Sequence, residues 1–365
     1  MATAKPLFSA LFGQYKLEKA QIRNRELGSG TYATVFEVEH IGLKCAGKKF
    51  NESLLKQGDS SHYVRRFAEE CRLLSQVRHP NIVQFLGVCS QQGGSDSAPV
   101  LVMEFLPIKL TTCIEQYYND PGGILPDEIS FSILHDVALG MCYLHNQNPP
   151  IVHRNLCSNN VLLTADMTAK ISDLGVAKIL DGVTGRMTLD LRTVAAYMPP
   201  EVMMAEPEYD ITIDTFSYGI LMIHMFSGVW PKPSVGQTYT DPSTEKLVAV
   251  TEVQRRKEFI DAIRDGHPLM KLILKCIDNN TKKRAHANEI VKQLAVVHEK
   301  FSAFTNRLDL LTALKKAENK LKEAEDKLKK LQISKSSEPQ LVTGKCLING
   351  QLEFTENGNG NGKSE

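Results

Sequence analysis

A glycine-rich stretch near the start of the chain is the first place where the residue types suggest chemistry. The stretch LGSGTYATVFE places Gly28 and Gly30 two residues apart, followed by Ala33 and Val35. Glycines let a hairpin backbone lie against a phosphate group with its amides exposed. A glycine-rich turn is also an ordinary connection between two strands, so this stretch alone leaves both interpretations open.

Further segments that could carry chemistry follow in a fixed order. Lys48 lies in the strand-like segment CAGKKF, thirteen residues after Val35, and Glu70 lies on an amphipathic segment nine residues before His79. Then come HRNLCSNNV, ISDLGVAK and AAYMPPEVM. Together with the glycine-rich stretch, these segments resemble the signature of the protein kinase family. The resemblance covers roughly residues 22–300, and six motifs in the right order make it specific for the fold.

The resemblance implies a set of residues that bind phosphates and metal. Lys48 would hold the α- and β-phosphates of ATP, supported by an ion pair with Glu70. The neighbouring Glu69 is the alternative partner, although the spacing and the helical face favour Glu70. Asp173, in the triplet Asp-Leu-Gly, and Asn160 would hold Mg²⁺. The expected cofactors are therefore ATP and Mg²⁺.

The resemblance also implies a pocket for the nucleotide. Three apolar side chains would sandwich the adenine, and the backbone from Glu104 to Leu106 would form a hinge that bonds the base, with Met103 narrowing the space behind it. The expected nucleotide-binding residues are Gly28, Gly30, Val35, Ala46, Lys48, Glu104, Leu106 and Leu162.

One position in the segment IVHRNLCSNNVLL departs from the family. Asn155 stands where the family carries an aspartate that accepts the proton of the substrate hydroxyl. An amide oxygen can accept a hydrogen bond, but it cannot take a proton at neutral pH. General-base assistance contributes about 10²- to 10⁴-fold in rate, which is roughly 3–5 kcal/mol of barrier. We therefore predict that Asn155 is a degraded base position and that Lys48 and Glu70 complete the catalytic set.

The sequence says less about which hydroxyl group accepts the phosphate. The segment YMPPE resembles serine/threonine kinases and the tyrosine-kinase-like group, whereas Cys157 fits neither the serine/threonine nor the tyrosine pattern of the catalytic loop. We favour serine and threonine hydroxyls of a protein substrate and leave tyrosine open.

Three charged residues are expected to be structural. Glu201, in the segment MPPE, resembles a glutamate that pairs in the family with an arginine late in the domain, and Arg284 matches that place. Asp214 resembles a buried aspartate that anchors the catalytic loop from a central helix. Loss of any of the three should cost stability before chemistry.

The elements that must position these residues change type along the chain. Residues 22–50 are strand-like: the run VFEVEHIGL alternates and KCAGKKF follows, with glycines between them as punctuation. Residues 62–79 have helical periodicity. Two short apolar runs follow, and after Pro107 the pattern is mostly helical through about Phe301. This order predicts an α+β, two-lobed kinase-like fold, with a small β-rich N-lobe and a larger helical C-lobe. The face of the first helix should carry Phe67, Cys71, Leu74 and Val77.

The expected domain organisation has four parts. Residues 1–21 form an N-terminal arm, with a mitochondrial presequence as the alternative, and residues 22–300 form the kinase-like domain, with N-lobe 22–103, hinge 104–107 and C-lobe 108–300. Residues 301–333 form a helical extension, because Leu314, Leu321 and Leu328 repeat every seven residues. This helix could associate with a second copy or lie back on the domain. The polar residues 334–365 are expected to be a disordered tail.

Composition excludes several classes of protein. The net charge is +1 with a pI near 7.6, which gives no basis for binding nucleic acid or an anionic membrane. No stretch reaches the ~20 apolar residues that a spanning helix requires. The eight cysteines are scattered singly, which suits a cytoplasmic protein.

Three functions from different classes fit these features. The first is an ATP-dependent kinase of intracellular signalling that phosphorylates protein hydroxyls slowly. The second is an inactive pseudokinase that acts as a nucleotide-gated scaffold and docks a partner. The third is an adaptor that no longer binds nucleotide, and the presence of Lys48, Glu70, Asn160 and Asp173 argues against it.

Overall fold

The computed structural model describes most of the first 302 residues. The described residues are 13–30, 33–51, 61–90, 99–119, 123, 125–179, 197–203, 210–228, 238–240, 247–249, 263 and 266–302. The chain divides into two compact units, Met1–Asn306 and Arg307–Glu365. The predicted heptad helix and polar tail, and the first twelve residues of the predicted arm, lie outside the described residues.

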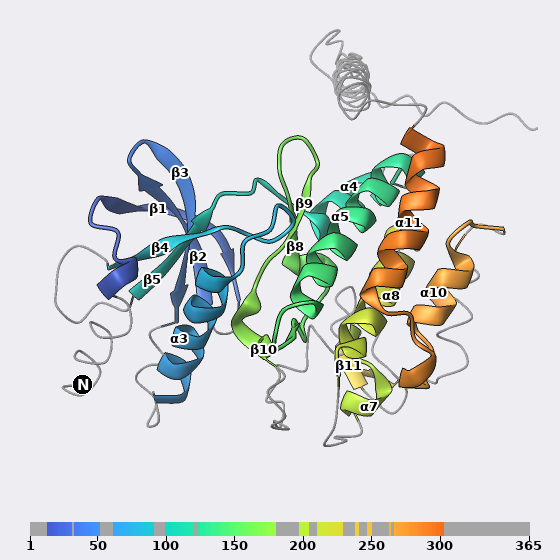
Figure 1. Cartoon of the computed structure of the whole chain (residues 1–365). Helices are drawn as coiled ribbons and strands as arrows, with labels where there is room; N and C mark the ends of the chain where they lie inside the picture. The colour runs from blue at the N-terminus through green and yellow to red at the C-terminus, as the bar shows by residue number, and fades with distance from the viewer. Residues whose placement is uncertain are drawn as a thin grey trace, which may run out of the picture. The chain divides into compact units, whose positions relative to one another are not determined.

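A five-stranded sheet forms the N-terminal part of the first unit (Figure 1). A short 3₁₀ turn, η1 (Gly13–Tyr15), precedes it. Its strands are antiparallel in the order β1-β2-β3-β5-β4, namely β1 (Ala20–Ser29), β2 (Ala33–His40), β3 (Leu43–Phe50), β5 (Pro99–Glu104) and β4 (Phe85–Ser90).

The interior of this sheet depends on a close approach at Gly47. A Cβ on Gly47 would lie 2.4 Å from Cγ2 of Val38 and 2.8 Å from Cγ1 of Val100. Because Val38 and Val100 are fully buried, any side chain at Gly47 would force the two apart. This glycine therefore sets the packing of β2, β3 and β5 around Lys48, the next residue along β3.

Helix α3 (Ser61–Gln76) packs against the sheet (Figure 1). Phe67, Cys71 and Leu74 are almost fully buried, as their three- and four-residue spacing predicted, and Leu73 joins them in the same core cluster. The helix follows from an amphipathic sequence whose apolar face is covered by the sheet, and this packing carries the adjacent Glu70 inward.

The C-terminal part of the first unit is mainly helical (Figure 1). The helices among its described residues are α4 (Leu110–Asn119), α5 (Asp127–His145), α7 (Pro200–Met203), α8 (Thr212–Ser227), α10 (Met270–Cys276) and α11 (Ala287–Ser302). Helix α8 is buried along nearly its whole length, and α5 packs against both α8 and α11. Buried polar groups on α8, such as Asp214, can therefore be shielded from water.

Short strands and turns between these helices carry the expected catalytic segments. One small sheet has the order β6-β8-β9, with β6 (Ile108–Lys109), β8 (Val161–Leu163) and β9 (Ala169–Ile171). The strand pair β7 (Ile151–Val152) and β10 (Lys178–Ile179) is separate, as is the pair β11 (Thr238–Thr240) and β12 (Leu247–Ala249). The 3₁₀ turns described in this part of the chain are η2 (Ser158–Asn160), η3 (Leu174–Val176) and η5 (Thr281–Lys283).

The expected α+β fold with a sheet-rich lobe and a larger helical lobe is confirmed. The run from Val35 to Leu43 contains the turn between β2 and β3, in a region where glycines were expected to interrupt the strand pattern. Ile41 and Gly42 form this turn with φ angles of 51° and 76°. Positive φ is costly for a β-branched residue, so Gly42, and not Ile41, is the sign of this turn in the sequence.

Candidate active site

Lys48 is the centre of a charged cluster between the sheet and the helical lobe. Its Nζ donates to Oε1 and Oε2 of Glu70 at 2.7 and 3.0 Å and to Oδ1 of Asp173 at 2.6 Å. Burial alone would lower the pKa of Lys48, but the carboxylates of Asp173 and Glu70 outweigh it and raise that pKa. The lysine is therefore a fixed cation, and the cluster holds one positive and two negative groups.

Glu70, rather than Glu69, is the partner of Lys48. Glu70 is 2% exposed, whereas Glu69 lies on the outer face of α3 and pairs with Arg72 at 2.6 Å. Two adjacent helical residues point about 100° apart, so only one of them can face the sheet.

The catalytic segment is anchored by Asp214 on α8. Its Oδ2 accepts from the backbone N–H of His153 at 2.8 Å and contacts Nε2 of His145 at 2.8 Å, and its Oδ1 accepts from the N–H of Arg154 at 2.8 Å. Burial alone would raise the pKa of Asp214, but these hydrogen bonds and the nearby histidines lower it. The expected anchoring role of Asp214 is confirmed.

The backbone at Arg154 is held in a costly conformation by this anchor. Arg154 has a φ of 63°, in the left-handed region that a non-glycine residue adopts at a cost of order 1–3 kcal/mol. Asp173 has the same φ of 63°. Two strained residues thus flank the site, one next to Asn155 and one in the Asp-Leu-Gly triplet.

Asn155 presents a side-chain acceptor that no donor in the described part of the chain satisfies. Its Oδ1 is buried and has no hydrogen-bond partner there. The backbone of Asn155 is bonded, since its N–H donates to Nδ1 of His153 at 3.2 Å and its carbonyl accepts from Nδ2 of Asn160 at 2.8 Å. A buried acceptor without a donor destabilises the folded protein, and a hydrogen bond donated by a hydroxyl group removes that cost.

Asn160 and Asp173 supply oxygen atoms suited to a magnesium ion. The bond from Asn160 Nδ2 to the Asn155 carbonyl fixes the amide and turns Oδ1 away from that carbonyl. A Cβ on Gly175 would lie 2.9 Å from Oε2 of Glu70 and 3.1 Å from Oδ1 of Asp173, so only a glycine leaves this space open. Mg²⁺ is usually held by one or two protein groups with waters and phosphates completing the shell. The donor set therefore fits the ion.

The three predicted adenine-contacting side chains lie on strands that meet around this cluster. Val35 on β2 is opposite Lys48, and Ala46 on β3 is opposite Met103. Leu162 on β8 is half-buried between two fully buried neighbours. All three are partly exposed apolar residues, as the lining of a hydrophobic binding surface is.

Glu104, at the start of the predicted hinge, forms a salt bridge with its side chain. Lys170 on β9 donates from Nζ to both carboxylate oxygens of Glu104 at 2.7 and 2.8 Å. The N–H of Glu104 donates to the carbonyl of Gln84 at 3.0 Å. This amide is therefore not free to donate a hydrogen bond to adenine. Leu106, further along the hinge, packs against the core cluster of the sheet.

The glycine-rich stretch is the hairpin between β1 and β2. Gly28 is opposite Val35, and Gly30 donates from its N–H to the carbonyl of Ala33 at 2.9 Å. Asn51 also donates from Nδ2 to the Gly30 carbonyl at 3.0 Å. The two glycines thus lie beside Val35, a predicted adenine contact.

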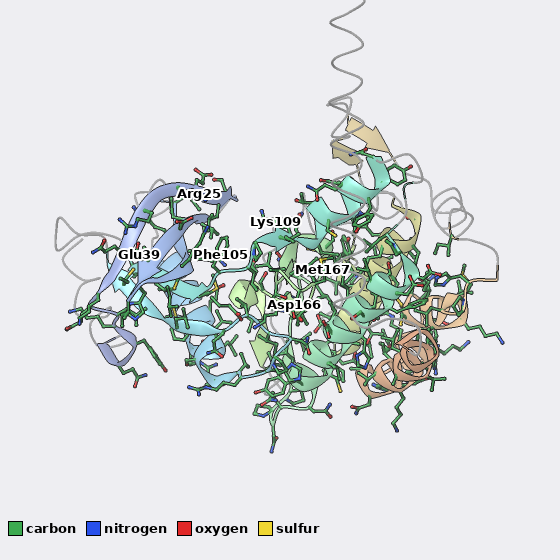
Figure 2. All side chains as sticks on the ribbon, turned by 90° about the horizontal axis from the view of Figure 1, so that it is seen from above. Arg25, Glu39, Phe105, Lys109, Asp166 and Met167 are labelled. Carbon is green, nitrogen blue, oxygen red and sulfur yellow. The ribbon has the colours of Figure 1, made fainter. Side chains whose placement is uncertain are left out.

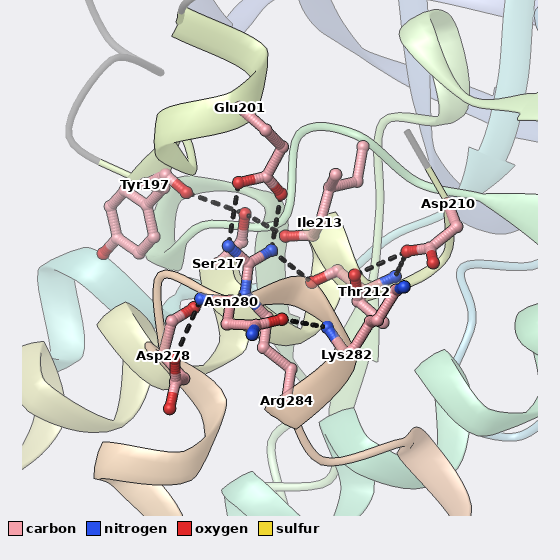
Figure 3. A network of polar contacts seen from close by, with 10 residues as sticks. All are labelled: Tyr197, Glu201, Asp210, Thr212, Ile213, Ser217, Asp278, Asn280, Lys282 and Arg284. Atoms are coloured by element: carbon pink, nitrogen blue, oxygen red, sulfur yellow. Dashed lines mark hydrogen bonds and ion pairs between the residues drawn. The ribbon is translucent and has the colours of Figure 1, made fainter. Parts of the chain in front are cut away.

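A buried ion pair supports the helical lobe (Figure 3). Arg284 donates to Oε1 and Oε2 of Glu201 at 2.5 and 2.8 Å, and its Nε donates to the carbonyl of Asp278 at 2.8 Å. The expected pairing of Glu201 with Arg284 is confirmed. Because the guanidinium also donates to the carbonyl of Thr212 at 3.3 Å, it ties the end of η5 to both α7 and α8.

Sequence reasoning missed two residues of the site. His145 contacts Asp214, and Lys109 on β6 lies beside Gly28, where a Cβ would be 3.1 Å from the lysine Nζ. Neither residue is in a recognisable motif, and both reach the site through contacts between segments far apart in the chain.

The lobes, the Lys48 cluster and the anchored loop together define a protein kinase domain. Residues 22–294 match the family described as protein tyrosine and serine/threonine kinase. The chain therefore belongs to this family.

Relatives with curated names are consistent with this membership. The chain is 28% identical over 314 residues to serine/threonine-protein kinase 12 of Arabidopsis thaliana, covering 84% of this chain and 63% of the relative. It is 30% identical over 277 residues to probable serine/threonine-protein kinase drkC of Dictyostelium discoideum, covering 75% and 34%. It is 27% identical over 309 residues to wall-associated receptor kinase-like 14 of Arabidopsis thaliana, covering 78% and 40%. The chain spans less than two thirds of each relative's length.

In the described part of the chain, no helix combines the length and the apolar composition needed to cross a bilayer.

Proposed function

We propose that this protein binds ATP with Mg²⁺ and transfers the γ-phosphate to serine or threonine hydroxyls of a protein substrate, slowly because Asn155 replaces the base. The observation that carries the proposal is Lys48 held between Glu70 and Asp173. Pairing of a phosphate-binding lysine with a helix glutamate, together with an aspartate for the metal, is the arrangement that protein kinases use for phosphoryl transfer.

The roles of the residues follow from this arrangement. Lys48 presents a permanent positive charge to the phosphates, and Glu70 fixes its position. Asn160 and Asp173 would hold Mg²⁺, which when bound neutralises charge that develops on the phosphates. The apolar contacts to the adenine would come from Val35, Ala46 and Leu162.

Asn155 limits the reaction in the proposed mechanism. Its Oδ1, which no donor among the described residues occupies, can accept a hydrogen bond from a substrate hydroxyl and so orient the nucleophile, but it cannot remove the proton. Positioning and charge neutralisation carry most of the catalysis of phosphoryl transfer. The expected result is slow transfer rather than none.

A radiolabelled transfer assay tests the proposal. Wild-type protein is compared with Asp173→Asn, which removes the metal-binding carboxylate, and transfer is followed to the protein itself and to a mixed library of serine, threonine and tyrosine peptides. Wild type should transfer label above the level of Asp173→Asn, mainly to serine and threonine. Equal label in both proteins would show that wild type has no transfer of its own.

Asn155 also supports a second candidate, a nucleotide-gated scaffold. In that case ATP and Mg²⁺ stabilise a conformation that docks a partner, and residues 301–333 would associate with the partner or with a second copy. The scaffold binds nucleotide but transfers no phosphate, so nucleotide binding with equal label in the assay above would favour it. We also propose a cytoplasmic location, because singly scattered cysteines suit a reducing compartment.

A further inference from the structure

Lys109 is a second cation beside the candidate nucleotide site. It lies on β6, opposite Leu162 on β8, which is one of the predicted adenine contacts. Its ammonium group is 3.1 Å from the position of a Cβ on Gly28, which is opposite Val35 on β2. The side chain of Lys109 thus reaches from β6, which pairs with the strand of Leu162, to β1, which pairs with the strand of Val35. Figure 2 places Lys109 between the sheet and the start of α4.

The charge of Lys109 has no acidic partner in the described part of the chain. Other lysines around the site are paired: Lys44 with Glu37, Lys48 with Glu70 and Asp173, and Lys170 with Glu104. Lys109 is exposed, and no carboxylate of a described residue pairs with it. Helix α4 begins at the next residue and has no acidic residue in its first turn. A cation without such a partner, beside a helix N-terminus, favours a nearby anion.

Gly28 leaves space beside the Lys109 ammonium. A Cβ at position 28 would lie 3.1 Å from Nζ, a tight contact that the flexible lysine can relieve by a shift of a few tenths of an ångström. The glycine therefore lets the lysine lie directly against the hairpin that is expected to cover the phosphates.

We infer that Lys109 is a positioning residue for the nucleotide, which attracts its phosphate chain and makes binding selective for phosphorylated nucleosides over adenosine. The inference rests on the proposed nucleotide-binding function. Lys48 and the metal act on the phosphates from the inner end of the site, whereas Lys109 acts from the strand next to the adenine contacts. Its charge gives no advantage to an uncharged ligand such as adenosine.

Binding of MgADP and of adenosine to three variants tests this inference. Lys109→Met removes the charge and keeps the length of the side chain, Lys109→Arg keeps the charge, and Lys271→Met removes an exposed charge on α10 as the matched control. Affinities are measured by calorimetry at low and at physiological salt. Melting temperatures check that each variant is folded.

Lys109→Met should weaken MgADP binding about 3- to 10-fold at low salt, because an exposed charge-assisted contact is partly screened. Adenosine binding should change less than about 2-fold, and the MgADP deficit should shrink as salt is added. Lys109→Arg and Lys271→Met should bind like wild type.

Two results would overturn the inference in different ways. Wild type could bind MgADP while Lys109→Met binds it equally well, or loses affinity for adenosine by the same factor as for MgADP. Either result would show that Lys109 does not interact with the phosphates, and the proposed function would be unaffected. If wild type binds neither ligand, the proposed function fails and the inference fails with it.

Discussion

Asn155→Asp is the substitution that addresses the chemistry of the site most directly. It adds a carboxylate that can accept a proton, where the amide can only accept a hydrogen bond. The expected gain is about 10²- to 10⁴-fold in the rate of transfer, equivalent to roughly 3–5 kcal/mol of barrier. The backbone should not move, since Asp214 and Asn160 hold the loop through main-chain atoms on both sides.

The same substitution should make the free protein less stable. The new carboxylate would occupy the buried Oδ1 position, which has no donor among the described residues. Wild type already leaves an uncharged oxygen unsatisfied at this position, so the added cost is that of desolvating a charge there, of the order of 1–3 kcal/mol. For a domain of this size that is a fall of roughly 2–12 °C in melting temperature. Activity and stability should therefore change in opposite directions.

Single-turnover transfer of radiolabelled γ-phosphate at saturating MgATP is the suitable assay, with Asn159→Asp as the control. Asn159 lies four residues further along the same loop and is similarly half-buried, so the control adds the same charge without restoring the base position. Equal rates for wild type and Asn155→Asp, or an equal gain in Asn159→Asp, would refute the reasoning that the missing base limits the reaction.

Three further predictions concern stability. Arg284→Met should lower the free energy of unfolding in urea by about 3–5 kcal/mol, because it leaves Glu201 buried without its ion-pair partner; a loss below about 1 kcal/mol would contradict this. Burial lowers the pKa of His224 to about 4, which disfavours the charged imidazolium in the folded protein. The free energy of unfolding should therefore be constant above the ordinary histidine pKa near 6.5 and fall by about 3 kcal/mol as the pH drops to about 4. His224→Asn should flatten that decline, and an unchanged pH profile would rule out His224 as its cause. Ile41→Asn should raise the free energy of unfolding by about 1 kcal/mol, because asparagine tolerates the positive φ of this turn and the side chain of Ile41 is 71% exposed; a loss of stability in the same urea titration would refute this.

The fold was predictable from the sequence because its signals are local. The helical spacing of Phe67, Cys71 and Leu74 predicted the buried face of α3, and the order of the motifs predicted two lobes. The ion pair between Glu201 and Arg284 was also predictable, although 83 residues separate the partners, because both lie in motifs of the family.

The details of the site were less predictable because they depend on packing. Lys48 bonds Asp173 across 125 residues, and His145 meets Asp214 across 69 residues. Lys109 reaches Gly28 only because a two-residue strand pairs with β8. The positive φ of Arg154 likewise has no local sign in the sequence, since it is held by the bonds that Asp214 accepts.

The central claim is that the site around Lys48 binds a triphosphate although its base position is degraded, and thermal denaturation with MgATP tests it most directly. A ligand at about 100 times its Kd stabilises the folded state by about 2.7 kcal/mol, which corresponds to a rise of roughly 5–10 °C in melting temperature for a domain of this size. Wild type should show such a rise at millimolar MgATP, and Asp173→Asn a much smaller one. An unchanged melting temperature for wild type at millimolar MgATP would contradict the central claim.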